Sequence, residues 1–262
     1  MNTNAIPILQ AVLEDYALPW DGDHGVAHWA RVLENGLRLA EETGAIDAIG
    51  LWVLRRACVE AALWPAPLTV AVNLSALQFA SDNLVQLVGQ ALSDAGLAPE
   101  RLELEITESL LMHNTEQVMG QLRALSALGV SIAMDDFGTG YSSLAYLWRF
   151  PFDKVKIDRA FTHNLGHDAK VGVIVHSIIS LAHSLDIRVN AEGVETPSQM
   201  AALQDRGCDE LQGFLLGKPG PSEGLTHTGR MDAIPLRRTE PRESLFATFP
   251  MELPATRPGP MG

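Results

Sequence analysis

The sequence has few basic residues, few cysteines and no long apolar run. It holds 19 Lys and Arg against 32 Asp and Glu, a net charge of −13, so it lacks the basic face of a nucleic-acid-binding protein. Its two cysteines, Cys58 and Cys208, make no disulfide framework and favour a reducing compartment, so we expect a cytoplasmic protein. No uncharged apolar run reaches the roughly 18 residues that a membrane span needs. Residues 1–18 carry Glu14 and Asp15 rather than the basic start of a signal peptide.

Short apolar segments alternate with amphipathic ones through the middle of the chain. This pattern is typical of βα units and predicts an α/β protein with a parallel sheet. The arrangement would be either an open sheet or most of a TIM-like (β/α) barrel, incomplete because about six strands are recognisable. The expected strands are 68–74, 102–106, 130–134, 154–157, 188–191 and 210–214. The expected helices are 24–42, 47–63, 81–95, 115–128, 170–185 and 197–206.

The two ends of the chain depart from this alternation. Residues 1–38 form an atypical helical segment, and the barrel extends over residues 39–221. From residue 222 onward no apolar periodicity remains, and seven of the 15 prolines lie at or after Pro221. We therefore expect residues 222–262 to be a disordered, proline-rich tail.

Two adjacent carboxylates, Asp135 and Asp136, end the apolar segment 130–134 and precede a Gly-Thr-Gly turn. In a continuous strand they would point to opposite faces, but a turn of the backbone at the strand end would let both reach one cation. Carboxylates without nearby cysteine favour a hard cation such as Mg²⁺, Mn²⁺ or Ca²⁺. Taken alone, a solvated strand-to-loop turn explains the same residues equally well.

Polar side chains stand at the end of every expected strand. In a parallel sheet these ends share one face, where such folds place their chemistry. Clustered acids raise each other's pKa unless cations bind among them, so the set predicts a metal site. Two divalent cations about 3.5–4 Å apart would suit phosphodiester hydrolysis, with Lys156 positioning the water or neutralising a phosphate oxygen. The alternative for Lys156 is a salt bridge to Asp135 or Asp158. The strand-end residues are Asn73, Glu105, Glu108, Asp135, Asp136, Lys156, Asp158, Glu192, Glu195 and Gln212.

From about Leu39 to Pro219 the chain resembles the EAL family of cyclic-di-GMP phosphodiesterases. The matching pieces are Leu39-Ala40-Glu41-Glu42-Thr43-Gly44, Asn73-Leu74-Ser75, Glu105-Ile106-Thr107-Glu108-Ser109, Asp135-Asp136-Phe137-Gly138-Thr139-Gly140-Tyr141-Ser142-Ser143-Leu144, Lys156-Ile157-Asp158-Arg159, Ala191-Glu192-Gly193-Val194-Glu195-Thr196 and Gln212-Gly213-Phe214. The resemblance implies metal-dependent opening of cyclic-di-GMP to linear pGpG with Mg²⁺ or Mn²⁺ at a two-metal site, and it makes a homodimer plausible.

The resemblance also implies roles for individual residues. Lys156 would orient the attacking water, and Asp135 and Glu192 join it as catalytic residues. The implied metal ligands or their close partners are Asn73, Glu105, Asp135, Asp136, Asp158 and Glu192. The implied ligand-binding residues are Gln212, Asn73 and Arg159. A supporting loop that links the site to a dimer interface would comprise Glu108, Phe137, Gly138, Thr139, Gly140, Ser142 and Glu195.

The chain departs from this family near its N-terminus. The family's Glu-Ala-Leu tripeptide, whose Glu binds metal, does not occur before Leu39, and the nearest candidate has Ala27 where the Glu should be. The first barrel strand and this one both look missing. Residues 21–44 instead weakly resemble the start of an HD-type phosphohydrolase, in which His24 and His28 could share a helix face, although a capping or surface role is favoured.

Three functions are therefore open from the sequence. The first is an enzyme with most of the site intact. The second is a catalytically inactive module that binds cyclic-di-GMP or a protein partner in signalling. The third is a marginally stable remnant without activity. Loss of a metal-ligand partner costs about 10–100-fold in metal affinity or activity, and a missing ligand costs more. Two missing strands would also leave sheet edges to be covered.

Overall fold

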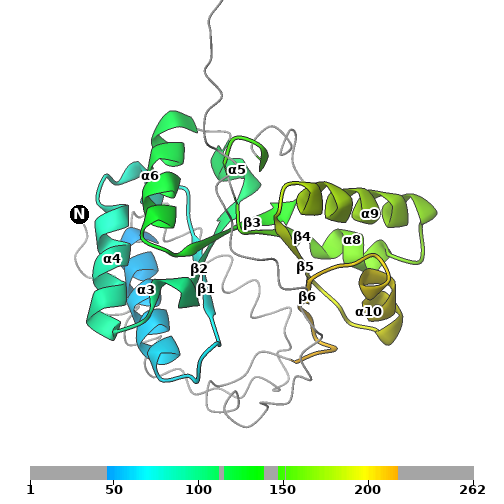
Figure 1. Cartoon of the computed structure of the whole chain (residues 1–262), viewed down its shortest axis with the longest axis horizontal. Coiled ribbons are helices and arrows are strands. Elements are labelled where there is room, and N and C mark those ends of the chain that lie inside the picture. The colour runs from blue at the N-terminus through cyan, green and yellow to red at the C-terminus, as the bar shows by residue number, and fades with distance from the viewer. Residues whose placement is uncertain (1–45, 112–114, 139–146, 151, 218–262) are drawn as a thin grey trace, which may run out of the picture. The chain divides into compact units, whose positions relative to one another are not determined.

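The computed structural model of the chain describes residues 46–111, 115–138, 147–150 and 152–217. Within these ranges the elements alternate as the sequence predicts (Figure 1). The strands are β1 (Val70–Leu74), β2 (Leu102–Thr107), β3 (Ser131–Phe137), β4 (Lys154–Ile157), β5 (Arg188–Ala191) and β6 (Glu210–Leu211). The helices are α3 (Ile46–Ala62), α4 (Leu84–Ala95), α5 (Glu108–Leu111), α6 (Thr115–Ala127), α8 (Arg159–Asn164), α9 (Ala169–Ser184) and α10 (Pro197–Gln204).

The six strands form one parallel sheet in the order β1-β2-β3-β4-β5-β6. Every strand pairs with the strand before it in the chain, and the helices that connect them lie beside the sheet (Figure 1). This sequential winding confirms the expected α/β fold of TIM-like type with six strands. The first expected helix, with Ala27, His24 and His28, and the proline-rich tail lie outside the described residues.

One face of the sheet is apolar and belongs to the hydrophobic core. Leu104, Ile132, Val155 and Val189 are fully buried in a single cluster that includes residues of the helices. Because side chains alternate along a strand, the residues between these point to the opposite face. That second face carries charge at buried positions on β2 and β4, which is where the candidate site lies.

Two helices begin with capping interactions that their sequences encode. The Asp168 carboxylate accepts a hydrogen bond from the Lys170 backbone N–H at the start of α9. At the start of α10, Thr196 and Gln199 form a reciprocal capping box, with Pro197 in the first turn. The capping box marks where the segment after β5, which carries Glu192, enters α10.

Candidate active site

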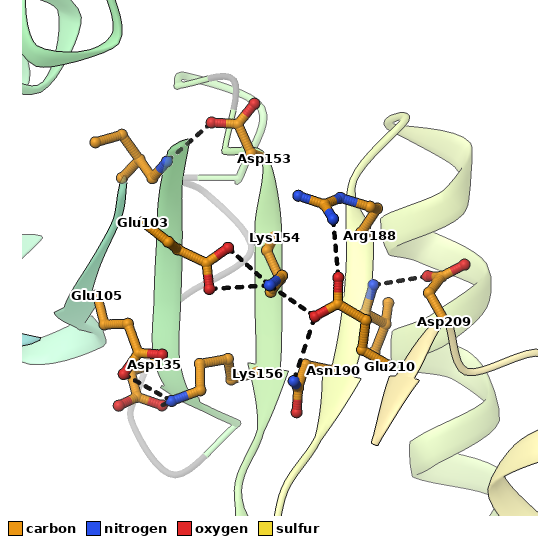
Figure 2. Close-up of polar contacts among 12 residues, drawn as sticks. Glu103, Glu105, Asp135, Asp153, Lys154, Lys156, Arg188, Asn190, Asp209 and Glu210 are labelled. Carbon is orange, nitrogen blue, oxygen red and sulfur yellow. Dashed lines mark hydrogen bonds and ion pairs between the residues drawn. The ribbon is translucent and has the colours of Figure 1, made fainter. Parts of the chain in front are cut away.

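Three carboxylates from three strand ends meet around the ammonium group of a lysine on a fourth strand. Lys156 Nζ on β4 lies 2.9 Å from Glu105 Oε2 of β2, 3.1 Å from Asp135 Oδ1 of β3 and 2.6 Å from Glu192 Oε1 just after β5. Figure 2 shows Glu105, Asp135 and Lys156 converging in this way. Glu192 is held at the end of β5 because its backbone N–H donates to the Ile157 carbonyl. The ion pair of Lys156 with Asp135 is present, and its partners also include Glu105 and Glu192.

The backbone turns at Asp136, as a shared site for adjacent carboxylates requires. Asp136 has φ of 55°, and the β3–β4 register shifts between Met134 and Phe137. The Asp136 N–H donates to Asp135 Oδ1 at 3.0 Å, which fixes the Asp135 carboxylate beside its own backbone. As a result, carboxylate oxygens of Asp135, Asp136 and Glu192 all lie within 4.8 Å of one another. Left-handed backbone at a residue other than glycine is uncommon and occurs often at functional sites.

The charges of this cluster are out of balance. Three carboxylates, those of Glu105, Asp135 and Glu192, contact the single ammonium of Lys156, and a fourth, that of Asp136, lies close to Asp135 and Glu192. Burial raises the pKa of Glu105 and of Glu192 above its ordinary value, although the hydrogen bond from Lys156 opposes the shift in both cases. Burial and the neighbouring Asp135 also raise the pKa of Asp136.

Lys156 stays charged in this setting. Burial alone would lower the pKa of Lys156, but the hydrogen bonds to Glu105 and Glu192 and the negative charges of these residues together raise the pKa by more. The cluster therefore keeps one fixed positive charge and still has excess negative charge, which a further cation would neutralise.

The donors present fit a hard divalent cation. Asp135, Asp136 and Glu192 offer only carboxylate oxygens, and Mg²⁺, Mn²⁺ and Ca²⁺ take oxygen ligands. Among the described residues this is the one group of three acidic, histidine or cysteine side chains close enough to share an ion.

The remaining predicted residues lie around this cluster at different depths. Asn73 on β1 is exposed and pairs in register with Glu105. Asp158 caps α8 by accepting from the Ala160 N–H at 2.8 Å, and it is close enough to Asp136 to raise the pKa of that carboxyl. Arg159 is exposed, and its positive charge lowers the pKa of Asp136. Gln212 is also exposed.

The supporting loop is described only in part. Phe137 is buried and Gly138 has φ of 95°, whereas Thr139, Gly140 and Ser142 lie outside the described residues. Glu108 is buried at the start of α5. Glu195 is exposed, and its backbone N–H donates to Gln199 Oε1.

A second charged layer lies beneath this cluster, and sequence reasoning missed it. Lys154 Nζ lies 2.7 Å from Glu103 Oε2 and 2.6 Å from Glu210 Oε2, and Arg188 Nη1 lies 2.8 Å from Glu210 Oε1 (Figure 2). Asn190 Nδ2 also contacts Glu210, at 3.5 Å. The signal was available, because Glu103, Lys154 and Asn190 stand two residues before Glu105, Lys156 and Glu192 and so face the same way. Two acids meet two bases in this lower layer, so its charges balance.

The fold and this site together define a class of protein. It is a parallel, sequentially wound (β/α) protein with acidic residues gathered at the carboxyl ends of its strands, where barrel enzymes place their chemistry. The EAL domain family model matches residues 18–219, so the chain belongs to the EAL domain family. The match begins ahead of the boundary expected at residue 39, and the domain boundaries stay a prediction.

Several proteins and solved structures are similar in sequence to most of this chain. The bifunctional diguanylate cyclase/cyclic di-GMP phosphodiesterase MucR of Pseudomonas aeruginosa is 50% identical over 193 residues, 72% of this chain and 28% of that protein. A solved structure of PaMucR phosphodiesterase in complex with c-di-GMP has 50% identity and a TM-score of 0.69, covering 72% of this chain and 78% of that one. The manganese and cyclic-di-GMP complex of Klebsiella pneumoniae BlrP1 has 32% identity and a TM-score of 0.61, covering 65% and 44%.

The chain spans about a quarter of the length of the curated relatives it matches, 23% and 28% in two cases. Within the part of the chain that the structure describes, no helix is both long and apolar enough to cross a membrane.

Proposed function

We propose that this chain hydrolyses cyclic-di-GMP to linear pGpG in a reaction that depends on divalent metal. The observation that supports this most directly is the cluster of Asp135, Asp136 and Glu192 beside Lys156 in a chain of the EAL family. Relatives have been solved with cyclic-di-GMP, and one of them with manganese as well.

Asp135, Asp136 and Glu192 would hold the cation, with Glu105, Asn73 and Asp158 as further ligands or their partners. Divalent cations, when bound, activate a water and stabilise charge on phosphate oxygens. Lys156 keeps its proton, because its pKa is raised. Its ammonium can therefore donate to the attacking water or to a phosphate oxygen throughout the reaction.

The ligand would lie over the exposed polar residues around the cluster. Arg159 is exposed at the end of β4, close to Asp136, and an arginine suits a phosphate because its guanidinium donates two parallel hydrogen bonds. Gln212 and Asn73 are exposed at the ends of β6 and β1, where their amides could bind the nucleotide edge.

The second candidate function is binding without turnover. The absence of a Glu-Ala-Leu sequence before Leu39 favours it, because the family's metal-binding Glu stands in that tripeptide. A site with one ligand fewer would bind metal more weakly and would still present Lys156 and Arg159 to the phosphates.

One experiment separates the two functions. The pure protein is incubated with cyclic-di-GMP and Mn²⁺, pGpG is measured by chromatography, and nucleotide binding is measured by calorimetry. Asp135→Asn tests the cluster, and Asp94→Asn, exposed on α4, is the matched control. Turnover that Asp135→Asn abolishes and Asp94→Asn leaves intact supports the enzyme. Binding without turnover supports the receptor, and neither activity overturns both.

A homodimer through the loop after Asp136, a cytoplasmic location and the choice between Mg²⁺ and Mn²⁺ are parts of the same proposal. Light scattering coupled to gel filtration tests the dimer, since a molar mass of one 28.4 kDa chain at all concentrations would exclude it. Turnover measured in each metal alone tests the choice of metal.

A further inference from the structure

Asn190 on β5 has an amide oxygen that no neighbour uses. The residue is 8% exposed, and its Nδ2 makes only a long contact, 3.5 Å, with Glu210 Oε2. Its Oδ1 is buried and has no hydrogen-bond partner among the described residues. Among the described strand residues, Asn190 alone has a buried side-chain oxygen without a hydrogen-bond partner. Leaving such an oxygen unpaired is destabilising, so its presence calls for an explanation.

Lys156 is the neighbour of Asn190 on β4. Lys156 and Asn190 are direct partners in the β4–β5 register, and both side chains are buried on the same face of the sheet. In Figure 2 the Asn190 amide nitrogen is turned toward Glu210 and its oxygen away from it. The other acceptors below Lys156, on Glu103 and Glu210, are already bound to Lys154.

The present position of Lys156 conflicts with metal binding. Its ammonium lies 3.1 Å from Asp135 and 2.6 Å from Glu192, the carboxylates that with Asp136 would hold a divalent cation. A positive charge at that distance repels a second cation, and the ammonium contacts one oxygen of each of these two carboxylates. A cation therefore occupies the cluster more favourably when the ammonium turns away from Asp135 and Glu192. The flexible four-carbon stem of lysine allows this movement.

We propose that Asn190 is a positioning residue that receives the Lys156 ammonium when a divalent cation enters the Asp135–Asp136–Glu192 cluster. The ammonium then donates a hydrogen bond to Asn190 Oδ1 and gives up contacts with Asp135 and Glu192. A neutral acceptor suits this role, because a carboxylate in its place would hold the ammonium permanently. The inference rests on the metal centre of the proposed function.

The test is Mn²⁺ affinity measured by calorimetry without nucleotide, on wild type, Asn190→Val, Lys156→Met and the double variant. Losing the acceptor for Lys156 should weaken Mn²⁺ binding roughly tenfold in Asn190→Val, as loss of a metal-site partner does. In the Lys156→Met background the same change should have no effect, because no ammonium remains to be received. Asn190→Asp would hold the ammonium away from the cluster even without metal, so this variant should bind Mn²⁺ at least as tightly as wild type.

Thermal unfolding without metal distinguishes this role from a structural one. Asn190→Val removes an unpaired buried oxygen, so its metal-free melting temperature should equal or exceed that of wild type while its Mn²⁺ affinity falls. Wild-type Mn²⁺ affinity in Asn190→Val, or an equal loss with and without Lys156, would overturn the inference alone. Failure of the wild type to bind Mn²⁺ would overturn the metal centre and the inference together.

Discussion

Gly193 lies directly against Arg159, so closely that no other residue fits there. A Cβ built on Gly193 would lie 2.6 Å from the Cβ of Arg159 and 3.3 Å from its Cα. Gly193 also has φ of +67°, which a residue with a side chain rarely adopts. This contact holds the loop after β5, which carries Glu192, against the end of β4, which carries Arg159.

We expect Gly193→Ala to disturb the site as well as the fold. The added methyl group would push Glu192 and Arg159 apart, lowering the free energy of unfolding by more than the ~1 kcal/mol that left-handed backbone alone costs. Gly96→Ala is the matched control, since Gly96 has φ of +63° with nothing within 4 Å. Urea unfolding should show a greater loss of stability, and Mn²⁺ titration a greater loss of affinity, in Gly193→Ala than in Gly96→Ala. Equal losses in the two variants would contradict the close contact.

Lys156→Met should make the fold depend on metal. The variant leaves Glu105, Asp135 and Glu192 without their shared partner, and breaking such a buried pair costs about 3–5 kcal/mol. Without metal its melting temperature should fall well below that of wild type, and Mn²⁺ should raise it by more than it raises wild type. Lys170→Met, at an exposed lysine of α9, is the control. A metal-free variant as stable as wild type would show that the ammonium is not needed to balance the acids.

The acid cluster should make the metal-free protein less stable as pH rises. The folded-state pKa values of Glu105, Asp136 and Glu192 are raised above their unfolded values, so between the two values the folded state binds more protons. Their contribution is full below the unfolded pKa, near pH 4.5 for the two glutamates, and is lost as pH rises through the folded pKa.

Glu192→Gln isolates this effect. Its free energy of unfolding, measured in urea without metal, should fall less steeply with rising pH above about pH 4.5 than that of wild type. Glu116→Gln, an exposed acid of α6, should leave the slope unchanged. Saturating Mn²⁺ should remove the steeper fall of the wild type with pH, because the bound cation favours the ionised carboxylates. Parallel pH profiles of Glu192→Gln and wild type would refute the raised pKa.

The ion pairs of the lower charged layer, unlike Asn190, should stabilise the fold without serving the metal. Lys154 is buried between Glu103 and Glu210, so Lys154→Met should cost about 3–5 kcal/mol in the free energy of unfolding. Arg188→Met in the same layer should cost at most about 1 kcal/mol, since Arg188 is half exposed and an exposed ion pair contributes little. Calorimetry should find Mn²⁺ affinity close to that of wild type in both variants. A tenfold loss of Mn²⁺ affinity in either variant would mean that the lower layer also supports metal binding.

The sequence predicted the strands well where apolar alternation marks them. The bounds of β4 and β5 agree with expectation, whereas β3 extends to Phe137 because Phe137 pairs with Ile157 of β4 after the turn at Asp136. The last strand ends at Leu211 rather than residue 214. Beyond Leu211 the Gln212 N–H donates to the Ala191 carbonyl and the Gln212 carbonyl accepts from the Val194 N–H, so the chain still follows the segment after β5 although the regular strand has ended. Helices α5 and α8 were not predicted, because four and six residues are too few to show a helical period.

The site was predictable by residue type but not by partner. Acids at strand ends indicated a cluster, and Asp135, Asp136 and Glu192 do meet. Which acids contact Lys156 depends on the register of three strand pairs. Asp158 caps α8, and its role at the metal stays a prediction. Pairing between residues more than 50 positions apart, such as Lys154 with Glu103, comes from that register and from no local pattern.

Because every described strand pairs with the one before it, the sheet can be assembled in the order of synthesis. Each segment leaving the ribosome meets a finished neighbour, and no strand has to wait for a distant one to appear. The described strands could thus pair one after another, with the acid cluster completed late, when the segment carrying Glu192 arrives.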